Sequence, residues 1–188
     1  MEDPRNLWQT QEVEEMKFSV EGLRAKAAKF QRRISWRNLR EYLAALIVIA
    51  LFGWNCWKET LLLPRIAFLM LIAASIYYMW HLHRWGSARP LPADAGSTSC
   101  VSFYRHELER QRDLVRNVWR WALLPLVPGL VLLDAYFIAN TQPSARWHLV
   151  GAILFEAAAF IGVLWLNLRS ARCLNRRIAE LDRELGRV

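Results

Sequence analysis

The 188-residue chain has only three cysteines, and none of them forms a Cys-x-x-Cys pair or a metal-ligand spacing. A metal site or a disulfide framework is therefore not expected. Glycine-rich phosphate loops, Gly-x-Ser-x-Gly and His-Glu-x-x-His motifs are also absent, so the common nucleotide, hydrolase and metalloprotease sites are not indicated. His81 and His83 are two residues apart, and such positions on a helix point to different faces, which excludes a chelating pair. We expect no catalytic residue, no cofactor and no metal, and a protein that is not an enzyme.

Positive charge is nearly absent from two of the three gaps between four apolar stretches. The stretches cover residues 42–57, 66–83, 121–139 and 148–168. Of 25 Lys and Arg residues, only Lys58, Arg65 and Arg146 lie in the first and third gaps. About 20 apolar residues cross a bilayer as a helix, and flanking Lys and Arg stay in the cytoplasm. The pattern predicts an all-α polytopic membrane protein with two transmembrane helical hairpins and both termini in the cytoplasm.

Tryptophan placement favours the same topology over a soluble all-helical protein. Nine of the ten Trp residues lie near an edge of an apolar stretch, the depth that an amphipathic indole prefers. The expected inner-boundary residues are Trp36, Trp80, Trp85, Trp119, Trp121 and Trp165, and the outer ones are Trp54, Trp57 and Trp147. The net charge of +8 does not indicate nucleic-acid binding, because the basic residues crowd the ends of apolar stretches, where anionic lipid headgroups attract them. The lipid bilayer is the first expected partner.

The chain divides into seven expected segments. They are an acidic segment 1–18, an amphipathic cytoplasmic helix 19–41, a transmembrane hairpin 42–83, an irregular cytoplasmic strap 84–98, a second amphipathic cytoplasmic helix 99–120, a second hairpin 121–168 and a cytoplasmic C-terminal helix 169–188. The acidic start has no apolar run, so the first apolar stretch is expected to direct insertion without a cleavable signal peptide. Pro125, Pro128 and Gly129 predict a kink in the third stretch. The first and last helices are expected to continue unbroken into their membrane spans.

The amphipathic cytoplasmic helices carry apolar seams with spacings of three and four residues. The candidate interaction seam consists of Val20, Leu23, Phe30, Ile34, Leu174, Ile178, Leu181 and Leu185. Such regular seams form a small internal bundle, lie on the membrane surface or bind a partner, and the C-terminal part resembles a coiled coil. We favour an internal bundle with part of its surface free for a protein partner or a second copy. Pairs such as Glu107–Arg110 are expected to support the exposed face of the second helix.

Two carboxylates interrupt the apolar stretches of the second hairpin. Asp134 and Glu156 lie about 8 Å and about 12 Å from the outer ends of their spans by helical rise, with Asn55 of the first span at a similar height. Carboxylates in hydrocarbon usually face the bundle interior and find a partner. These three residues form a candidate intramembrane polar site, which either takes up a proton or cation or only satisfies the two carboxylates structurally. A small channel or transporter is therefore the alternative function.

The two halves of the chain share one layout of amphipathic helix, span, short turn and span. Arg37-Asn38-Leu39 and Arg116-Asn117-Val118 occupy matching positions before the first and third spans. A parallel internal repeat is a hypothesis that follows from this match.

Four short motifs resemble those of uncharacterised small bacterial four-helix integral membrane proteins. They are Leu7-Trp8-Gln9, Phe18-Ser19-Val20-Glu21, Arg37-Asn38-Leu39-Arg40-Glu41-Tyr42 and Arg89-Pro90-Leu91-Pro92-Ala93-Asp94. The resemblance implies a bacterial inner-membrane location and a loose association with extracytoplasmic-function sigma factors, as in a membrane-held regulator. The chain lacks the Cys/His zinc motif common in anti-sigma domains, so a direct anti-sigma role is not implied. We expect a non-enzymatic membrane protein whose cytoplasmic helices bind a protein partner or self-associate.

Overall fold

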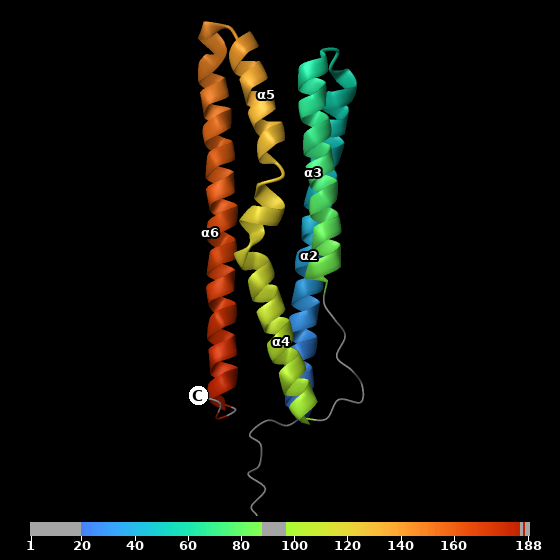
Figure 1. Cartoon of the computed structure of the whole chain (residues 1–188), viewed down its shortest axis with the longest axis vertical. Coiled ribbons are helices and arrows are strands. Elements are labelled where there is room, and N and C mark those ends of the chain that lie inside the picture. Colours follow the sequence, from blue (N-terminus) through green and yellow to red (C-terminus); the bar gives the residue numbers. More distant parts are fainter. Residues whose placement is uncertain (1–19, 88–96, 185, 187–188) are drawn as a thin grey trace, which may run out of the picture.

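The computed structural model describes residues 20–87, 97–184 and 186, and every regular element within them is helical. The all-α prediction is therefore confirmed. The elements are α2 (Val20–Lys58), α3 (Leu62–Gly86), α4 (Ser97–Arg116), the π-helical η1 (Trp119–Leu123), α5 (Val127–Asn140), the 3-10 turn η2 (Pro143–Ala145) and α6 (Arg146–Glu184). They form an elongated molecule in which the start of α2 and the end of α6 lie at the same end (Figure 1).

Three helices are long and apolar enough to cross a membrane. The qualifying segments are Ala27–Lys58, Leu62–Gly86 and Pro143–Arg183. Both α2 and α6 contain 39 residues, which corresponds to about 58 Å each. No glycine or proline lies between residues 23 and 52 of α2, and the expected continuity of both helices is confirmed. None of the apolar window of α6 is buried within the described chain.

The third apolar stretch is not one continuous helix. α4 ends at Arg116, four residues before the expected boundary, and is followed by η1 and a turn at residues 124–126. The backbone N–H of Leu124 donates to the carbonyl of Trp119 at 2.9 Å, which is an i to i−5 bond. Pro125 and Pro128 lack an N–H, so the regular ladder cannot continue here. The predicted kink is confirmed, and α5 keeps only 14 residues, fewer than the span of 121–139 that we expected.

The helices pack in two regions with different partners. One region, which we call the apolar half, consists of α3, η1, α5 and residues 42–58 and 146–168 of α2 and α6. In it, α3 lies between α2 and α5, whereas α5 and α6 touch only sparsely (Figure 1). α5 approaches α3 closely at the buried Gly129, where an added Cβ would lie 2.9 Å from Cγ of Leu71 and 3.3 Å from the carbonyl of Ala67. A side chain at residue 129 would therefore push α5 away from α3.

In the other half, α4 packs between the first part of α2 and the last part of α6. We call this unit, α4 with residues 20–41 and 169–184, the three-helix bundle. Its core contains Phe30 and Ile34 of α2, Leu108 of α4 and Ile178 of α6, flanked by Tyr104 and Leu174. Each fully buried apolar side chain of this size contributes about 1.5–3 kcal/mol by leaving water. The seams of the three amphipathic helices thus meet one another inside the chain.

Candidate functional site: a buried polar cluster at the end of α3

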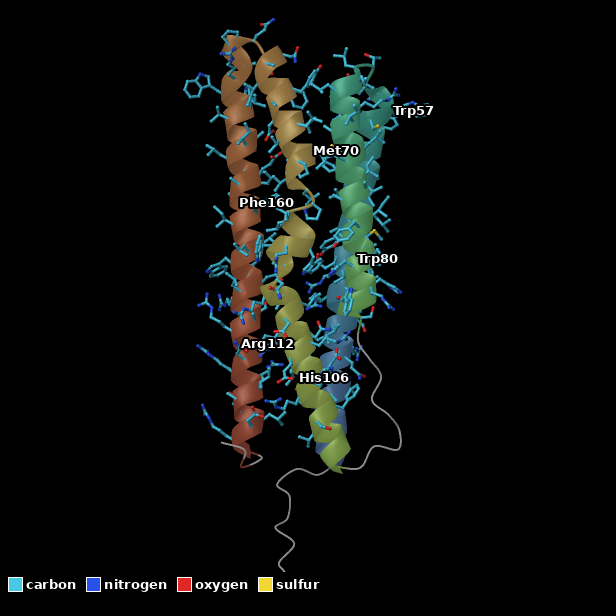
Figure 2. All side chains as sticks on the ribbon, in the orientation of Figure 1. Trp57, Met70, Trp80, His106, Arg112 and Phe160 are labelled. Carbon is cyan, nitrogen blue, oxygen red and sulfur yellow. The ribbon has the colours of Figure 1, made fainter. Side chains whose placement is uncertain are left out.

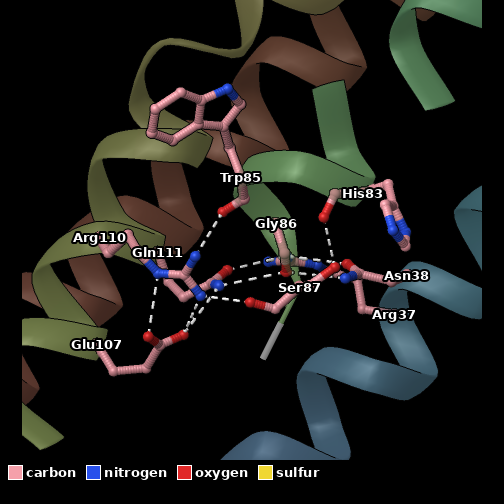
Figure 3. A network of polar contacts seen from close by, with 9 residues as sticks. All are labelled: Arg37, Asn38, His83, Trp85, Gly86, Ser87, Glu107, Arg110 and Gln111. Carbon is pink, nitrogen blue, oxygen red and sulfur yellow. Dashed lines mark hydrogen bonds and ion pairs between the residues drawn. The ribbon is translucent and has the colours of Figure 1, made fainter. Parts of the chain in front are cut away.

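The bundle and the apolar half meet at a group of polar side chains around the last turn of α3 (Figure 3). α2 and α4 supply the side chains, and α3 supplies main-chain carbonyls. We call these side chains the polar cluster, and they are Arg37, Asn38, Glu107, Arg110 and Gln111. Asn38, Glu107 and Gln111 are only 5%, 2% and 1% exposed. Buried polar atoms are costly without hydrogen bonds, so the partners of this group decide its role.

Two amides converge on the carbonyl of Gly86, the last residue of α3. The side-chain nitrogen of Asn38 donates to it at 2.8 Å, and that of Gln111 donates at 3.4 Å. The guanidinium of Arg37 donates at 3.0 Å to the side-chain oxygen of Gln111 and at 3.2 Å to that of Asn38. The last carbonyls of a helix have no partner within the helix. Side chains from α2 and α4 therefore cap α3 together and fix its end between them.

Arg110 extends the cap to the neighbouring carbonyls. Its guanidinium donates to the carbonyl of Trp85 at 3.1 Å and also to the carbonyl of Ser87. The same group forms an ion pair with Glu107 at 2.6 Å, and Glu107 also accepts from Gln111 at 3.3 Å. A cation at a helix C-terminus is favoured by the helix dipole. Arg110 thus links the end of α3 to a carboxylate on α4.

The Glu107–Arg110 pair forms, but it is buried, not on the exposed face where we expected it. Its depth follows from the register of α4, because residues 107, 110, 111 and 114 lie at helical spacings on the side that faces α2 and α3. The sequence did hold one signal for the cluster. Asn38 lies four residues after Ile34 and so continues the apolar seam of α2 with a polar residue. A lone amide within a seam often fixes register.

Stacked rings lie directly beside the polar cluster. Trp121 of η1 stacks on His81 at 4.6 Å and on Tyr78 at 5.4 Å between ring centroids. The indole N–H of Trp121 donates to the carbonyl of Leu114 at 3.0 Å, a carbonyl near the end of α4. Tyr78 donates from its hydroxyl to Glu41 at 2.6 Å. The break after α4 therefore places an aromatic residue of η1 against the last two turns of α3.

The candidate interaction seam lies largely inside the three-helix bundle. Phe30, Ile34, Ile178 and Leu181 are buried, and Leu174 is partly buried. Burial raises the pKa of the neighbouring Tyr104, and the cations Arg177 and Arg33 oppose that rise. Leu185 lies outside the described residues, as does the acidic segment 1–18, and the same holds for the side chains of Val20 and Leu23. The described part of the seam is therefore occupied by other helices of the same chain.

Two of the three residues of the candidate intramembrane polar site lie on helices that touch each other. Asp134 of α5 and Glu156 of α6 are both partly buried, and α5 and α6 are in sparse contact. Asn55 is exposed on α2, and its side-chain nitrogen donates to the carbonyl of Leu51 in its own helix at 2.8 Å. In the apolar half α2 packs on α3 rather than on α5 or α6, so a similar height did not make Asn55 a neighbour of the carboxylates.

Reactive arrangements are absent from the described residues. No group of three His, Cys, Asp or Glu side chains among them could hold a metal ion. Cys56 and Cys173 are free thiols on different helices. Within the described part of the chain, Nδ1 of His81 is buried without a hydrogen-bond partner. The polar cluster can therefore hold three helices in register.

Comparisons with known proteins add no relative from which a function could be carried over. No family model, no curated protein and no solved structure matches the chain.

Proposed function

We propose that the chain is a non-enzymatic integral membrane protein whose three-helix bundle binds a protein partner or a second copy in the cytoplasm. In this proposal the apolar half spans the membrane as two hairpins, with both termini on the cytoplasmic side. The resemblance of the sequence motifs to small bacterial membrane proteins supports the inner membrane as the location. It also supports the role of a membrane-held regulator.

One observation about tryptophan spacing carries the membrane part of the proposal. Trp147 and Trp165 on α6 are 18 residues apart. Both are more than half exposed. Eighteen residues make five complete helical turns, so the pair lies on one face, about 27 Å apart. That distance matches a hydrocarbon core of about 30 Å with an indole at each boundary.

The bundle supports a binding role because it is closed inside and strongly charged outside. Its apolar seams bury one another and its polar cluster satisfies its own hydrogen bonds. A partner therefore meets the outer surface, where Lys29 and Arg32 of α2 and Arg176 of α6 are exposed. Such a rigid platform continues directly into α2 and α6, so it stays at a fixed place relative to the membrane.

Labelling of single cysteines tests the topology. Cysteine introduced at Ser144 in the turn before α6 should react with a membrane-impermeant maleimide in intact cells, whereas the native Cys173 should react only after the membrane is opened. The cysteine-free variant is the control for background. Labelling of residues 144 and 173 from the same side would end the two-hairpin proposal.

Pull-down from mild detergent tests the binding role, with bound proteins identified and then re-tested as purified components. Substituting Lys29→Glu and Arg32→Glu on the outer face of α2 should weaken the association while insertion persists. Arg65→Glu, at the opposite end of the molecule, is the matched control. A substitution on the seam, such as Leu181→Asp, would not test binding alone, because Leu181 is buried and a charge there would unfold the bundle. A chain that neither binds a purified partner nor self-associates would contradict the proposal.

Two carboxylates on neighbouring helices favour a second candidate, a small channel or transporter that uses Asp134 and Glu156. Both are partly buried within apolar helices, where a carboxylate is costly unless it is protonated or paired. Flux of protons or cations into liposomes should then occur with the unmutated protein and stop in Asp134→Asn and Glu156→Gln. Asn55→Ala should leave the flux unchanged. Liposomes that show no flux with the unmutated protein would remove this candidate.

A further inference from the structure

The outward face of α6 changes its chemistry once along its length. A single line of exposed residues at spacings of three, four and seven runs through Trp147, Leu154, Ile161, Trp165, Arg169, Arg172 and Arg176. These spacings keep the residues on one side of the helix, opposite Leu174 and Ile178 of the core. The face is thus apolar from Trp147 to Trp165 and basic from Arg169 to Arg176. We call Arg169, Arg172 and Arg176 the arginine stripe.

The arginines of the stripe differ from those of α4. Arg105, Arg110 and Arg112 of α4 each form an ion pair with a carboxylate. The four ion pairs of the described residues include no member of the stripe. Glu180 lies one turn beyond Arg176 and takes part in none of these four ion pairs. The stripe therefore offers guanidinium groups that no carboxylate in the described chain already occupies.

The depth of the stripe fits lipid phosphates. If Trp165 marks the hydrocarbon boundary, Arg169 begins about 6 Å and Arg172 about 10 Å beyond it. Side chains on a helix lean toward its N-terminus, and for α6 this direction is back toward the apolar half. Nitrogen-tipped side chains stand out from the outer side of the lower part of α6 (Figure 2). The Arg169 guanidinium also lies 5.5 Å from the ring of Trp165, which holds it at the boundary by a cation–π contact.

From this continuity we propose that the outward face of α6 is a binding surface for anionic phospholipid, with the arginine stripe holding the phosphodiester headgroup and the apolar face contacting the acyl chains. Guanidinium groups bind phosphate through two parallel hydrogen bonds. An acidic peptide would also match the charge, but it would gain nothing from the exposed apolar face that leads into the stripe. The inference rests on the membrane placement in the proposed function and adds a ligand class to it.

The test compares two variants that lose the same charge. Full-length protein is assembled into nanodiscs of phosphatidylcholine with a minor fraction of phosphatidylglycerol, and the lipids that stay with it after mild detergent extraction are counted by mass spectrometry. Arg169→Gln with Arg172→Gln removes the upper stripe, whereas Lys58→Gln with Arg65→Gln removes two exposed cations from the other end of the apolar half. Enrichment of phosphatidylglycerol should fall about five-fold per arginine lost from the stripe and stay near the unmutated value in the Lys58 and Arg65 variant. Arg172→Gln alone is the second variant should the double substitution fail to insert.

Three results would overturn the inference. They are no enrichment with the unmutated protein, an equal loss in both variants, and loss of a co-purifying protein without loss of phosphatidylglycerol from the stripe variant. The last result would assign the stripe to an acidic protein partner. Cysteine labelling separates this outcome from failure of the proposed function, because correct labelling with no lipid enrichment removes only the lipid surface. Wrong labelling with enrichment intact removes only the topology.

Discussion

α2 and the α4–η1–α5 segment connect the three-helix bundle to the apolar half in different ways. α2 makes the connection as one helix of 39 residues. The other connection is interrupted by a π-helical segment and a turn between Arg116 and Val127. The difference shows that similar hydrophobic patterns can give a rigid connection in one half of a chain and a jointed one in the other.

The matched residues at the two connections have different surroundings. Asn38 is buried and donates to Gly86 on α3, whereas Asn117 is exposed and donates to the carbonyl of Asp113 in its own helix at 3.0 Å. The match of Arg37-Asn38-Leu39 with Arg116-Asn117-Val118 therefore does not extend to equivalent contacts. The hypothesis of a parallel repeat gains no support from these positions.

The largest expected effect comes from breaking the buried ion pair of the polar cluster. Glu107→Ala leaves the guanidinium of Arg110 without its carboxylate in a buried site, and should lower the free energy of unfolding by about 3–5 kcal/mol. Asp113→Ala removes an exposed carboxylate from the Arg112 pair and should cost at most about 1 kcal/mol. Unfolding of the purified protein in mixed micelles with rising SDS measures both. Similar costs for the two variants would show that the cluster does not hold the bundle to α3.

A methyl group at Gly129, where α5 lies close against α3, should give the next largest effect. Gly129→Ala places a Cβ against Leu71, which is fully buried and cannot move aside, so the free energy of unfolding should fall by about 2–3 kcal/mol. Gly53→Ala is the matched control on α2, since nothing lies within 4 Å of an added Cβ there. It should be neutral or slightly stabilising because alanine favours helix. A neutral Gly129→Ala would mean that α5 and α3 separate without cost.

The two matched asparagines allow a direct test of the comparison. Asn38→Ala removes the shorter hydrogen bond to Gly86 in a buried site, and should cost about 1–2 kcal/mol. Asn117→Ala removes an exposed local bond and should change the free energy of unfolding by less than about 0.5 kcal/mol. The same SDS titration gives both values. Equal losses would restore the idea that the two connections are equivalent.

The smallest expected effect concerns η1, the segment that interrupts the connection between α4 and α5. Trp121→Phe keeps a ring beside His81 but removes the N–H that donates to Leu114, and should cost about 1 kcal/mol. Trp119→Phe, at an exposed position of the same segment, is the control and should be close to neutral. Amide hydrogen exchange should rise around residues 114–118 only in Trp121→Phe. Unchanged exchange at residues 114–118 would show that the Trp121 indole does not stabilise the end of α4.

The helices could be predicted from the sequence, because long apolar stretches and seams at spacings of three and four are properties of each segment alone. The kink at Pro125 also follows locally from a missing N–H. The polar cluster could not be predicted, since its bonds between different helices and to the end of α3 join residues 23 to 74 positions apart and depend on the register of α4. Depth counting placed Asp134 and Glu156 at compatible heights, but it could not reveal that Asn55 belongs to a helix with other neighbours.

Because α2 and α6 are continuous helices, a change of tilt at one end moves the other end as well. A bilayer that thins or thickens changes the tilt of a spanning helix, and a rod of about 58 Å transmits that change undiminished to its far end. Because η1 and a turn separate α4 from α5, α4 can move together with α2 and α6 while α5 keeps its position. In the proposed membrane placement, a change of bilayer thickness would therefore change the angle between the ends of α2 and α6.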